Sequence, residues 1–217
     1  TAFGLHELAG SEDDPVRPRT LILVLGTTFR PGVVVGPGII WNGIGGLYGH
    51  HRRADTDALR ERLTSGAVGN VLFADDPLKN APILLGDLAA RFPRAAGVHV
   101  LGRTAQFGWV PLFDDYLIKA AVGVVIEYAD RIGRVVILGS FVLHVPPAPG
   151  MTATQREQLE NLLTVQIDVI GDIDPVRRIL AIDATIRRGR FLRIFTLSGD
   201  GAVRASVGEQ PYLTSTL

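Results

Sequence analysis

The segment Tyr116–Val145, YLIKAAVGVVIEYADRIGRVVILGSFVLHV, carries the pattern that decides the fold. Apolar residues occupy every second position from Ile118 to Ile126, which predicts a β-strand with one dry face, because successive side chains of a strand point to opposite faces. Asp130–Gly133 predicts a turn, and Arg134–Val145 predicts a returning strand that is largely apolar on both faces. Such a strand is typical of the centre of a sheet that is covered on both sides.

Alternating apolar residues recur on both sides of this hairpin. They predict strands at Thr20–Thr27, Val33–Trp41, Val98–Leu101, Ala105–Val110, Leu162–Ile170, Arg178–Arg187, Phe191–Ser198 and Ala202–Val207. Turns are expected at Arg30–Gly32, which would make a hairpin of the first two strands, at Arg188–Gly189 and at Gly199–Gly201. Consecutive strands joined by short turns predict an antiparallel meander.

A second kind of pattern occupies Gly43–Pro93. Asp55 is a good N-cap for a short amphipathic helix over about residues 56–64, and Asp75 and Asp76 precede Pro77 in a helix-entry pattern. A longer helix is then expected over Ile83–Phe92. The predicted fold class is therefore α+β, a mostly antiparallel β meander with a short two-helix insert at about residues 55–93 that packs on the sheet or caps it.

The glycine-rich run Gly43–Gly49, GIGGLYG, raises the question of a phosphate-binding loop. A dinucleotide fingerprint has the spacing G-x-G-x-x-G and opens a helix, whereas Tyr48 stands here where the third glycine is needed. The spacing therefore favours a glycine-rich strand or tight turn that passes close to another backbone.

Two residue pairs are candidates for chemistry. Asp75 and Asp76 could serve as paired carboxylates in acid-base catalysis or cation binding, but their place before Pro77 also accounts for them as helix caps. His50 and His51 could bind a metal, but adjacent side chains rarely point the same way, so they are interpreted as solvated loop histidines. The sequence accordingly predicts no catalytic, cofactor-binding or metal-binding residues and no cofactor.

Composition limits the function classes further. Lys and Arg total 22 and Asp and Glu total 22, so no net charge favours nucleic acid or an anionic membrane. Cysteine is absent, which excludes disulfides, thiolate catalysis and cysteine-bound zinc within this chain. The apolar runs fall short of the roughly 20 residues that a membrane helix needs. The sequence therefore predicts no nucleic-acid partner and no transmembrane helix, and it leaves both a cytoplasmic and an exported location open.

Arginines are concentrated near the C-terminal end of the chain. They stand at positions 177, 178, 187, 188, 190, 193 and 204, with Asp183 and Asp200 as the acidic residues of the same stretch. The cluster could form an edge that faces anions or lipid headgroups. It is also typical of strand ends and hairpin tips that are kept solvated so that they do not pair with other chains, and this interpretation is favoured.

Two boundaries divide the chain. Residues 1–19 lack helical or strand periodicity and are expected to form a surface arm, which leaves residues 20–217 as a single β-rich domain. The proline-rich run Val145–Gly150 predicts a linker before a brief helical turn at Thr154–Leu159, so a sub-boundary is placed at residues 146–153. The absence of an initial Met predicts that the chain is part of a longer protein.

The motif GIGGLYGHHRRADTDALRERLTSGAVGNVLFADDPLKNAP, with a later Phe107-Gly108-Trp109 and the run LSGDGAVRASVG at residues 197–208, resembles a family of uncharacterised bacterial domains. These domains occur in large, β-rich proteins, and the resemblance covers roughly residues 40–208. It implies a sheet-forming module of a larger chain, without an established activity or catalytic residues.

Three functions are predicted from these observations. The first is a non-catalytic structural or assembly module of a larger bacterial protein, whose partners are the remainder of that chain or copies of itself. The second is a binding module that holds an apolar ligand such as lipid in a groove or barrel of the sheet. The third and weakest is a hydrolase that would use Asp75, Asp76 or the histidines.

Overall fold

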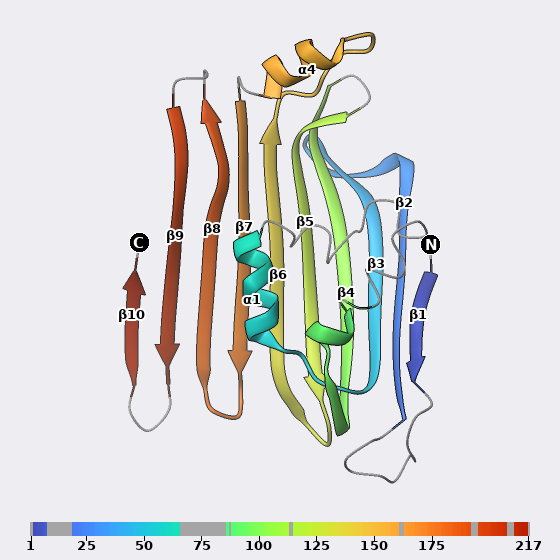
Figure 1. The fold of residues 1–217 in the computed structure, drawn as a ribbon, viewed down its shortest axis with the longest axis vertical. Helices are drawn as coiled ribbons and strands as arrows, with labels where there is room; N and C mark the ends of the chain where they lie inside the picture. The colour runs from blue at the N-terminus through green and yellow to red at the C-terminus, as the bar shows by residue number, and fades with distance from the viewer. Residues whose placement is uncertain are drawn as a thin grey trace.

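The structure is a computed structural model that describes residues 2–7, 19–65, 86, 88–112, 115–160, 163–191, 195–207 and 211–216. Its strands form a 10-stranded sheet in the order β1 to β10, and each strand runs antiparallel to the one before it (Figure 1). The strands are β1 Ala2–Glu7, β2 Thr20–Gly36, β3 Ile39–Arg52, β4 Arg94–Leu112, β5 Asp115–Tyr128, β6 Ile132–His144, β7 Leu163–Asp174, β8 Ile179–Phe191, β9 Phe195–Ser206 and β10 Tyr212–Thr216. The predicted fold class, a mostly antiparallel meander with short helices, is confirmed.

Helix α1, Thr56–Ser65, lies against one face of this sheet, which we call the helix face, and runs roughly along the strands (Figure 1). The Asp55 side chain accepts hydrogen bonds from the backbone N–H groups of Asp57, at 3.1 Å, and Ala58, at 3.0 Å, so Asp55 is the N-cap that the sequence predicts. Of the predicted second helix, the structure describes helical residues 86 and 88–91. Asp75 and Asp76 lie outside the described residues.

The apolar core lies between the helix face and these helical segments. Leu59 of α1 and Phe92 are each 1% exposed, and both belong to one cluster with residues of the sheet. The sheet and its connections contribute Ile22, Ala54, Val100, Ala121, Val125, Val136, Leu138 and Ile170 to this cluster. A single core therefore fixes the helices to β2 and β4–β7.

The first hairpin differs from its prediction. Arg30–Gly32 lies inside β2, and the turn to β3 falls at Pro37 and Gly38. Gly38 has a φ of 70°, which glycine adopts without strain, and β2 absorbs the break at Pro31 as a register shift between Thr28 and Val33. The predicted turn at Arg30–Gly32 is therefore wrong because the proline sits in a bulge of a longer strand.

Three further predictions need correction. Arg188–Gly189 is not a reversal, because β8 continues through it to Phe191 with a register shift between Ile186 and Gly189. A Cβ at Gly189 would lie 2.3 Å from the Leu197 carbonyl oxygen, so the glycine is needed for close strand packing rather than for a turn. Gly199–Gly201 likewise lies within β9. Residues 2–7 of the predicted surface arm form β1, which pairs with β2.

The proline-rich linker and the brief helix that follows it connect β6 to β7. The predicted helical turn is confirmed as α4, Ala153–Glu160, at one end of the sheet (Figure 1). Thr152 accepts a hydrogen bond from the Gln155 N–H at 3.3 Å, and the Gln155 side chain accepts one from the Thr152 N–H at 2.9 Å, an arrangement that satisfies both backbone amides. The sub-boundary at residues 146–153 thus falls between two directly paired strands.

Candidate functional site

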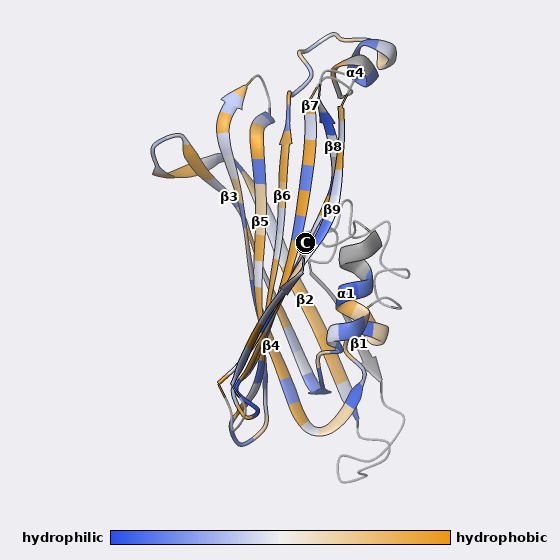
Figure 2. Cartoon of the chain, turned by 90° about the vertical axis from the view of Figure 1, so that its left-hand side faces the viewer, coloured by the Kyte–Doolittle hydropathy of each residue, from blue (hydrophilic) through white to orange (hydrophobic). Residues whose placement is uncertain are grey.

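The face of the sheet opposite the helices, which we call the far face, is apolar over most of β4–β8, with the polar pair His99 and Tyr128 at one end. Alternation along β4–β8 places on it Leu101, Arg103, Ala105, Phe107, Ile118, Ala120, Val122, Val124, Ile126, Val135, Ile137, Gly139, Phe141, Leu143, Val165, Ile167, Val169, Gly171, Ile173, Leu180, Ile182, Ala184 and Ile186. Among these described positions Arg103 alone is charged. Figure 2 shows the sheet from the side, with α1 against the opposite face.

Exposure differs sharply between the two faces of the same strand. On β6, Val136 and Leu138 are 0% and 2% exposed on the helix face, whereas Ile137 and Phe141 are 38% and 43% exposed on the far face. The prediction that this strand is covered on both sides is therefore wrong within the described chain. Both of its faces are apolar, but α1 and residues 88–91 lie on the helix face.

The covered face carries the charges of β7 and β8. Asp168, which is fully buried, and Asp172 and Asp183, which are largely buried, all lie on the helix face. Antiparallel sheets that are covered on one side usually turn their polar residues to the solvent side. Here the arrangement is reversed, and large exposed apolar patches of this kind mark surfaces that bind another molecule.

Arg103, the charged residue among the described far-face positions of β4–β8, is accommodated by a glycine. Arg103 on β4 stands directly across from Gly46 on β3, and a Cβ at position 46 would lie 3.1 Å from Nη1 of Arg103. The missing side chain thus leaves room for the guanidinium over β3. The same row of the far face continues from Arg103 through Val124 and Ile137 to Gly171 on β7 and Ile182 on β8, so Arg103 is separated from Ile137 by Val124 and is the charged residue of this row.

Helix α1 is attached to the helix face by an ion-pair network as well as by Leu59. Arg60 contacts Asp172 at 3.3 Å and Asp183 at 3.0 Å, and it also bonds to Asp57 within the helix at 2.9 Å. Burial disfavours its charge, but the hydrogen bonds to Asp183 and Asp57 raise the pKa of Arg60 above its ordinary value. Arg134 and Arg204 complete the network by pairing with Asp172 and Asp183 respectively.

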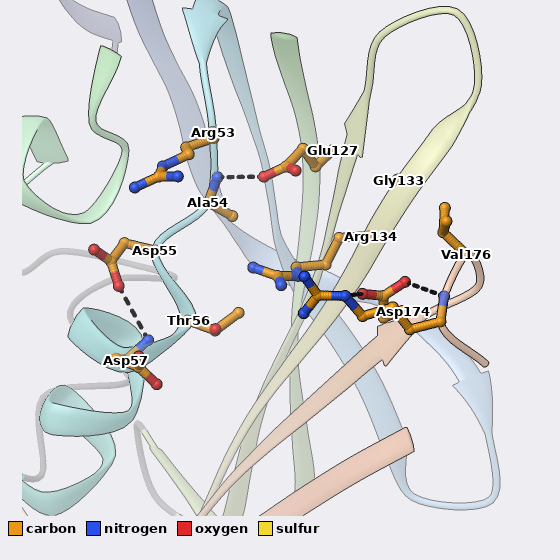
Figure 3. Close-up of a pocket in the computed structure, with 11 residues that line it drawn as sticks. Arg53, Ala54, Asp55, Thr56, Asp57, Glu127, Gly133, Arg134, Asp174 and Val176 are labelled. Atoms are coloured by element: carbon orange, nitrogen blue, oxygen red, sulfur yellow. Dashed lines mark hydrogen bonds and ion pairs between the residues drawn. The ribbon is translucent and has the colours of Figure 1, made fainter. Parts of the chain in front are cut away.

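A polar cleft with a volume of about 460 Å³ lies beside the first turn of α1 (Figure 3). Its carboxylates bind the chain itself: Glu127 accepts a hydrogen bond from the Ala54 N–H at 2.8 Å, and Asp174 accepts one from the Arg177 N–H at 2.8 Å. Asp55 caps α1. The Glu127 contact connects the helix entry to the end of β5, whereas the Asp174 contact holds the turn that follows β7. The three carboxylates are thus engaged with backbone amides, which is a structural role.

The glycine-rich run lies within β3, so the strand interpretation is confirmed. A Cβ at Gly45 would lie 2.3 Å from Oγ1 of Thr104, and one at Gly49 would lie 2.4 Å from Cγ2 of Val100. Thr104 and Val100 are the direct cross-strand partners of these glycines. The glycines therefore leave space for the side chains of Thr104 and Val100 on β4, and this space does not serve as a phosphate-binding loop.

The histidines form a cluster that the sequence did not indicate. His50 and His51 directly precede Arg52, the last residue of β3, and their ring centroids lie 4.8 Å and 5.4 Å from that of His99 on β4. His51 has a φ of 52°, which breaks the alternation of the strand and brings two adjacent rings within 4.1 Å of each other. The interpretation as solvated loop histidines is wrong for this reason. Among the described residues, no group of three or more His, Asp or Glu side chains is placed to hold a metal ion.

The cluster makes stability depend on pH. Burial, followed by the nearby charges of His50 and His51, lowers the pKa of His99 below its ordinary value of 6.5. The unfolded chain therefore binds this proton at a higher pH than the folded chain does. The resulting contribution to stability is complete above about pH 6.5 and is lost as the pH falls through the lower folded pKa.

We expect His99→Phe, which keeps an aromatic ring but cannot titrate, to reduce the loss of unfolding free energy on acidification. Urea denaturation of wild type and variant at pH 7.5 and pH 5 measures this difference. A pH dependence that is unchanged in the variant would show that His99 does not couple protonation to folding.

The arginines of the C-terminal region do not form one surface. Arg178 precedes the first residue of β8 and Arg190 lies near its end, which over this strand corresponds to a separation on the order of 40 Å. Arg204 is paired with Asp183 on the helix face, and Arg193 lies outside the described residues. A single anion-binding edge made of these arginines is therefore not supported by the described positions.

The described helices are all too short or too polar to cross a membrane. A comparison with known proteins finds no match among curated proteins and none among solved structures. The model of one protein family matches residues 1–215, a range that includes the first 40 residues, which the sequence resemblance had left out. Because this match spans nearly the whole chain, the protein belongs to the family of unknown function DUF6603.

Proposed function

We propose that this chain is a non-catalytic structural module of a larger bacterial protein and that it assembles through its far face. The observation that carries the proposal is the reversed polarity of the sheet: the exposed face is apolar while buried carboxylates lie on the covered one. Water contact with such a surface is unfavourable by roughly 25 cal/mol per Å² of apolar area. A second layer that covers it would remove this cost.

The size of the far face suits a protein partner. Five strands spaced by about 4.8 Å and about 12 residues long at 3.3 Å per residue offer on the order of 900 Å² of sheet. A standard protein interface buries about 800 Å² on each partner. Two sheets that pack face to face meet through apolar side chains of this kind, as in a β-sandwich. In the purified chain the available second layer is another copy.

The test introduces a charge in the middle of the far face. We expect the wild-type chain to associate at micromolar concentration and Ile137→Glu to weaken this association by at least about 100-fold, because an unpaired carboxylate would be buried in the interface. The control is Val176→Glu, which adds the same charge at a residue that is 51% exposed in the turn between β7 and β8. Sedimentation velocity measures both variants.

A wild-type chain that stays monomeric, or an association that Ile137→Glu does not change, would contradict assembly through the far face. Circular dichroism of the variant checks that it is folded. Folding is expected to survive, because Ile137 is 38% exposed and its new carboxylate can remain in water in the monomer.

The same surface supports a second candidate function, the binding of an apolar ligand such as lipid. Its observation is the set of large exposed side chains on the far face, among them Phe141 and Ile182, which acyl chains could cover. Native mass spectrometry after purification separates the two candidates. A co-purified lipid that is lost in Ile137→Glu would favour ligand binding, whereas wild-type oligomers free of added mass would favour assembly.

A further inference from the structure

The two edges of the sheet lie level with each other along the strand direction. Cross-strand pairing connects β1 to β10 through unbroken rows of residues. One row runs through Gly4, Leu23, Tyr48, Leu101, Ile126, Val135, Ile173, Leu180, Ala205 and Leu213. The next runs through Phe3, Val24, Leu47, Gly102, Val125, Val136, Asp172, Ala181, Arg204 and Thr214. The two edge strands, β1 and β10, are both short and are connected by the same rows of paired residues.

The direction of the edge strands allows the sheet to continue. Because the 10 strands alternate in direction, β1 and β10 point opposite ways (Figure 1). A second copy in the same orientation, placed beside β10, would therefore present its β1 antiparallel to it. The order β9-β10-β1-β2 across the junction would then be an ordinary antiparallel meander, with no change of direction or face.

The β10 edge is short, at five residues, but its strand carries no charged residue and no proline, two of the features that usually prevent pairing. All five residues of its sequence, YLTST, are exposed. Phe195 and Leu197, on β9 beyond the part that β10 covers, are 62% and 55% exposed. Natural sheets commonly protect such an edge with lysine, proline or a bulge to prevent contact with another chain. An unprotected edge is a site for strand addition.

We propose that β10 of one copy pairs with β1 of a second copy of this chain, with Leu213 opposite Gly4 and Thr214 opposite Phe3. The inference deepens the proposed function and rests on it, because Leu213 lies on the far face and the junction extends that apolar face from one copy to the next. The contact is head-to-tail, so it produces a growing sheet rather than a closed pair.

Disulfide trapping tests the pairing, because the wild-type chain has no cysteine. Gly4→Cys and Leu213→Cys are made in separate chains, mixed, and oxidised with oxidised glutathione. Residues directly opposite in an antiparallel pair have Cα atoms about 4.5–5.5 Å apart, within the range that a disulfide spans. We expect a mixed disulfide in the mixture at a yield at least 10-fold above that of either variant alone. Ala2→Cys with Ser215→Cys is a second pair in the same register.

The matched control is Gly4→Cys mixed with Thr214→Cys, because a shift by one residue turns the side chain to the opposite face. A mixed disulfide as abundant in this control, a Leu213→Cys chain that links mainly to itself, or no linkage in either in-register pair would overturn the proposal. Repeating the trapping with Ile137→Glu in both chains separates the two hypotheses. A mixed disulfide that still forms in Ile137→Glu chains, although these chains no longer associate through the far face, would support the edge contact. The two contacts would then be shown to form independently of each other.

Discussion

Leu138→Ala is expected to lower the free energy of unfolding by about 3 kcal/mol, the usual cost of removing a buried leucine side chain from a packed core. Leu138 is 2% exposed and belongs to the cluster that joins the helix face to α1 and Phe92. Urea denaturation followed by circular dichroism measures the change.

The neighbouring residue provides the control. Ile137 lies on the same strand and points to the far face, where it is 38% exposed. Ile137→Ala is expected to cost only about 1 kcal/mol, because less apolar surface is removed from contact. Equal losses for the two variants, measured at a concentration where the chain is monomeric, would mean that the far face is as well covered within one chain as the helix face.

Arg52→Met is expected to lower the free energy of unfolding by about 3 kcal/mol, because a buried guanidinium that donates to several partners is lost. Arg52 is 1% exposed and donates to the Phe92 carbonyl and the Thr20 hydroxyl, each at 2.8 Å. Arg52 thus connects the end of β3 to the start of β2 and to Phe92, which follows helical residues 88–91. Methionine keeps much of the side-chain volume, so the loss is mainly that of the donated hydrogen bonds.

Arg53→Met is the matched control, since the adjacent Arg53 side chain is exposed. Its backbone N–H bonds to the Pro93 carbonyl at 3.1 Å, and the substitution leaves that bond in place. A change within about 0.5 kcal/mol is expected for an exposed surface position. Thermal and urea denaturation of both variants measure the difference, and similar losses would show that burial of Arg52 does not contribute to stability.

Local patterns were sufficient for most of the fold. The alternation in Tyr116–Val145 predicts β5 and β6, and Asp55 predicts the start of α1, because each signal depends on neighbouring residues only. Turn residues were less informative. Arg30–Gly32 and Arg188–Gly189 resemble turns in sequence, but both are bulges inside long strands, where the pairing of the neighbouring strand decides the outcome.

The sidedness of the sheet could not be predicted. Alternation separates the two faces of β7 but does not say which one is covered, and the carboxylates of Asp172 and Asp183 would suggest the solvent side. They lie on the covered side because Arg60, which precedes them in sequence by 112 and 123 residues in turn, neutralises them there. The histidine cluster was missed for a similar reason, since the φ of His51 depends on its surroundings.

Whether the far face is covered in solution can be measured most directly with a thiol reagent. Ile137→Cys and Val176→Cys each place one thiol in a chain that otherwise has none. The wild-type chain can therefore associate with either variant without reacting with the thiol reagent. As wild-type chain is added, the reaction rate at Ile137→Cys is predicted to fall with the associated fraction while the rate at Val176→Cys stays constant. An Ile137→Cys rate that does not change over the concentrations at which the chain associates would contradict assembly through the far face.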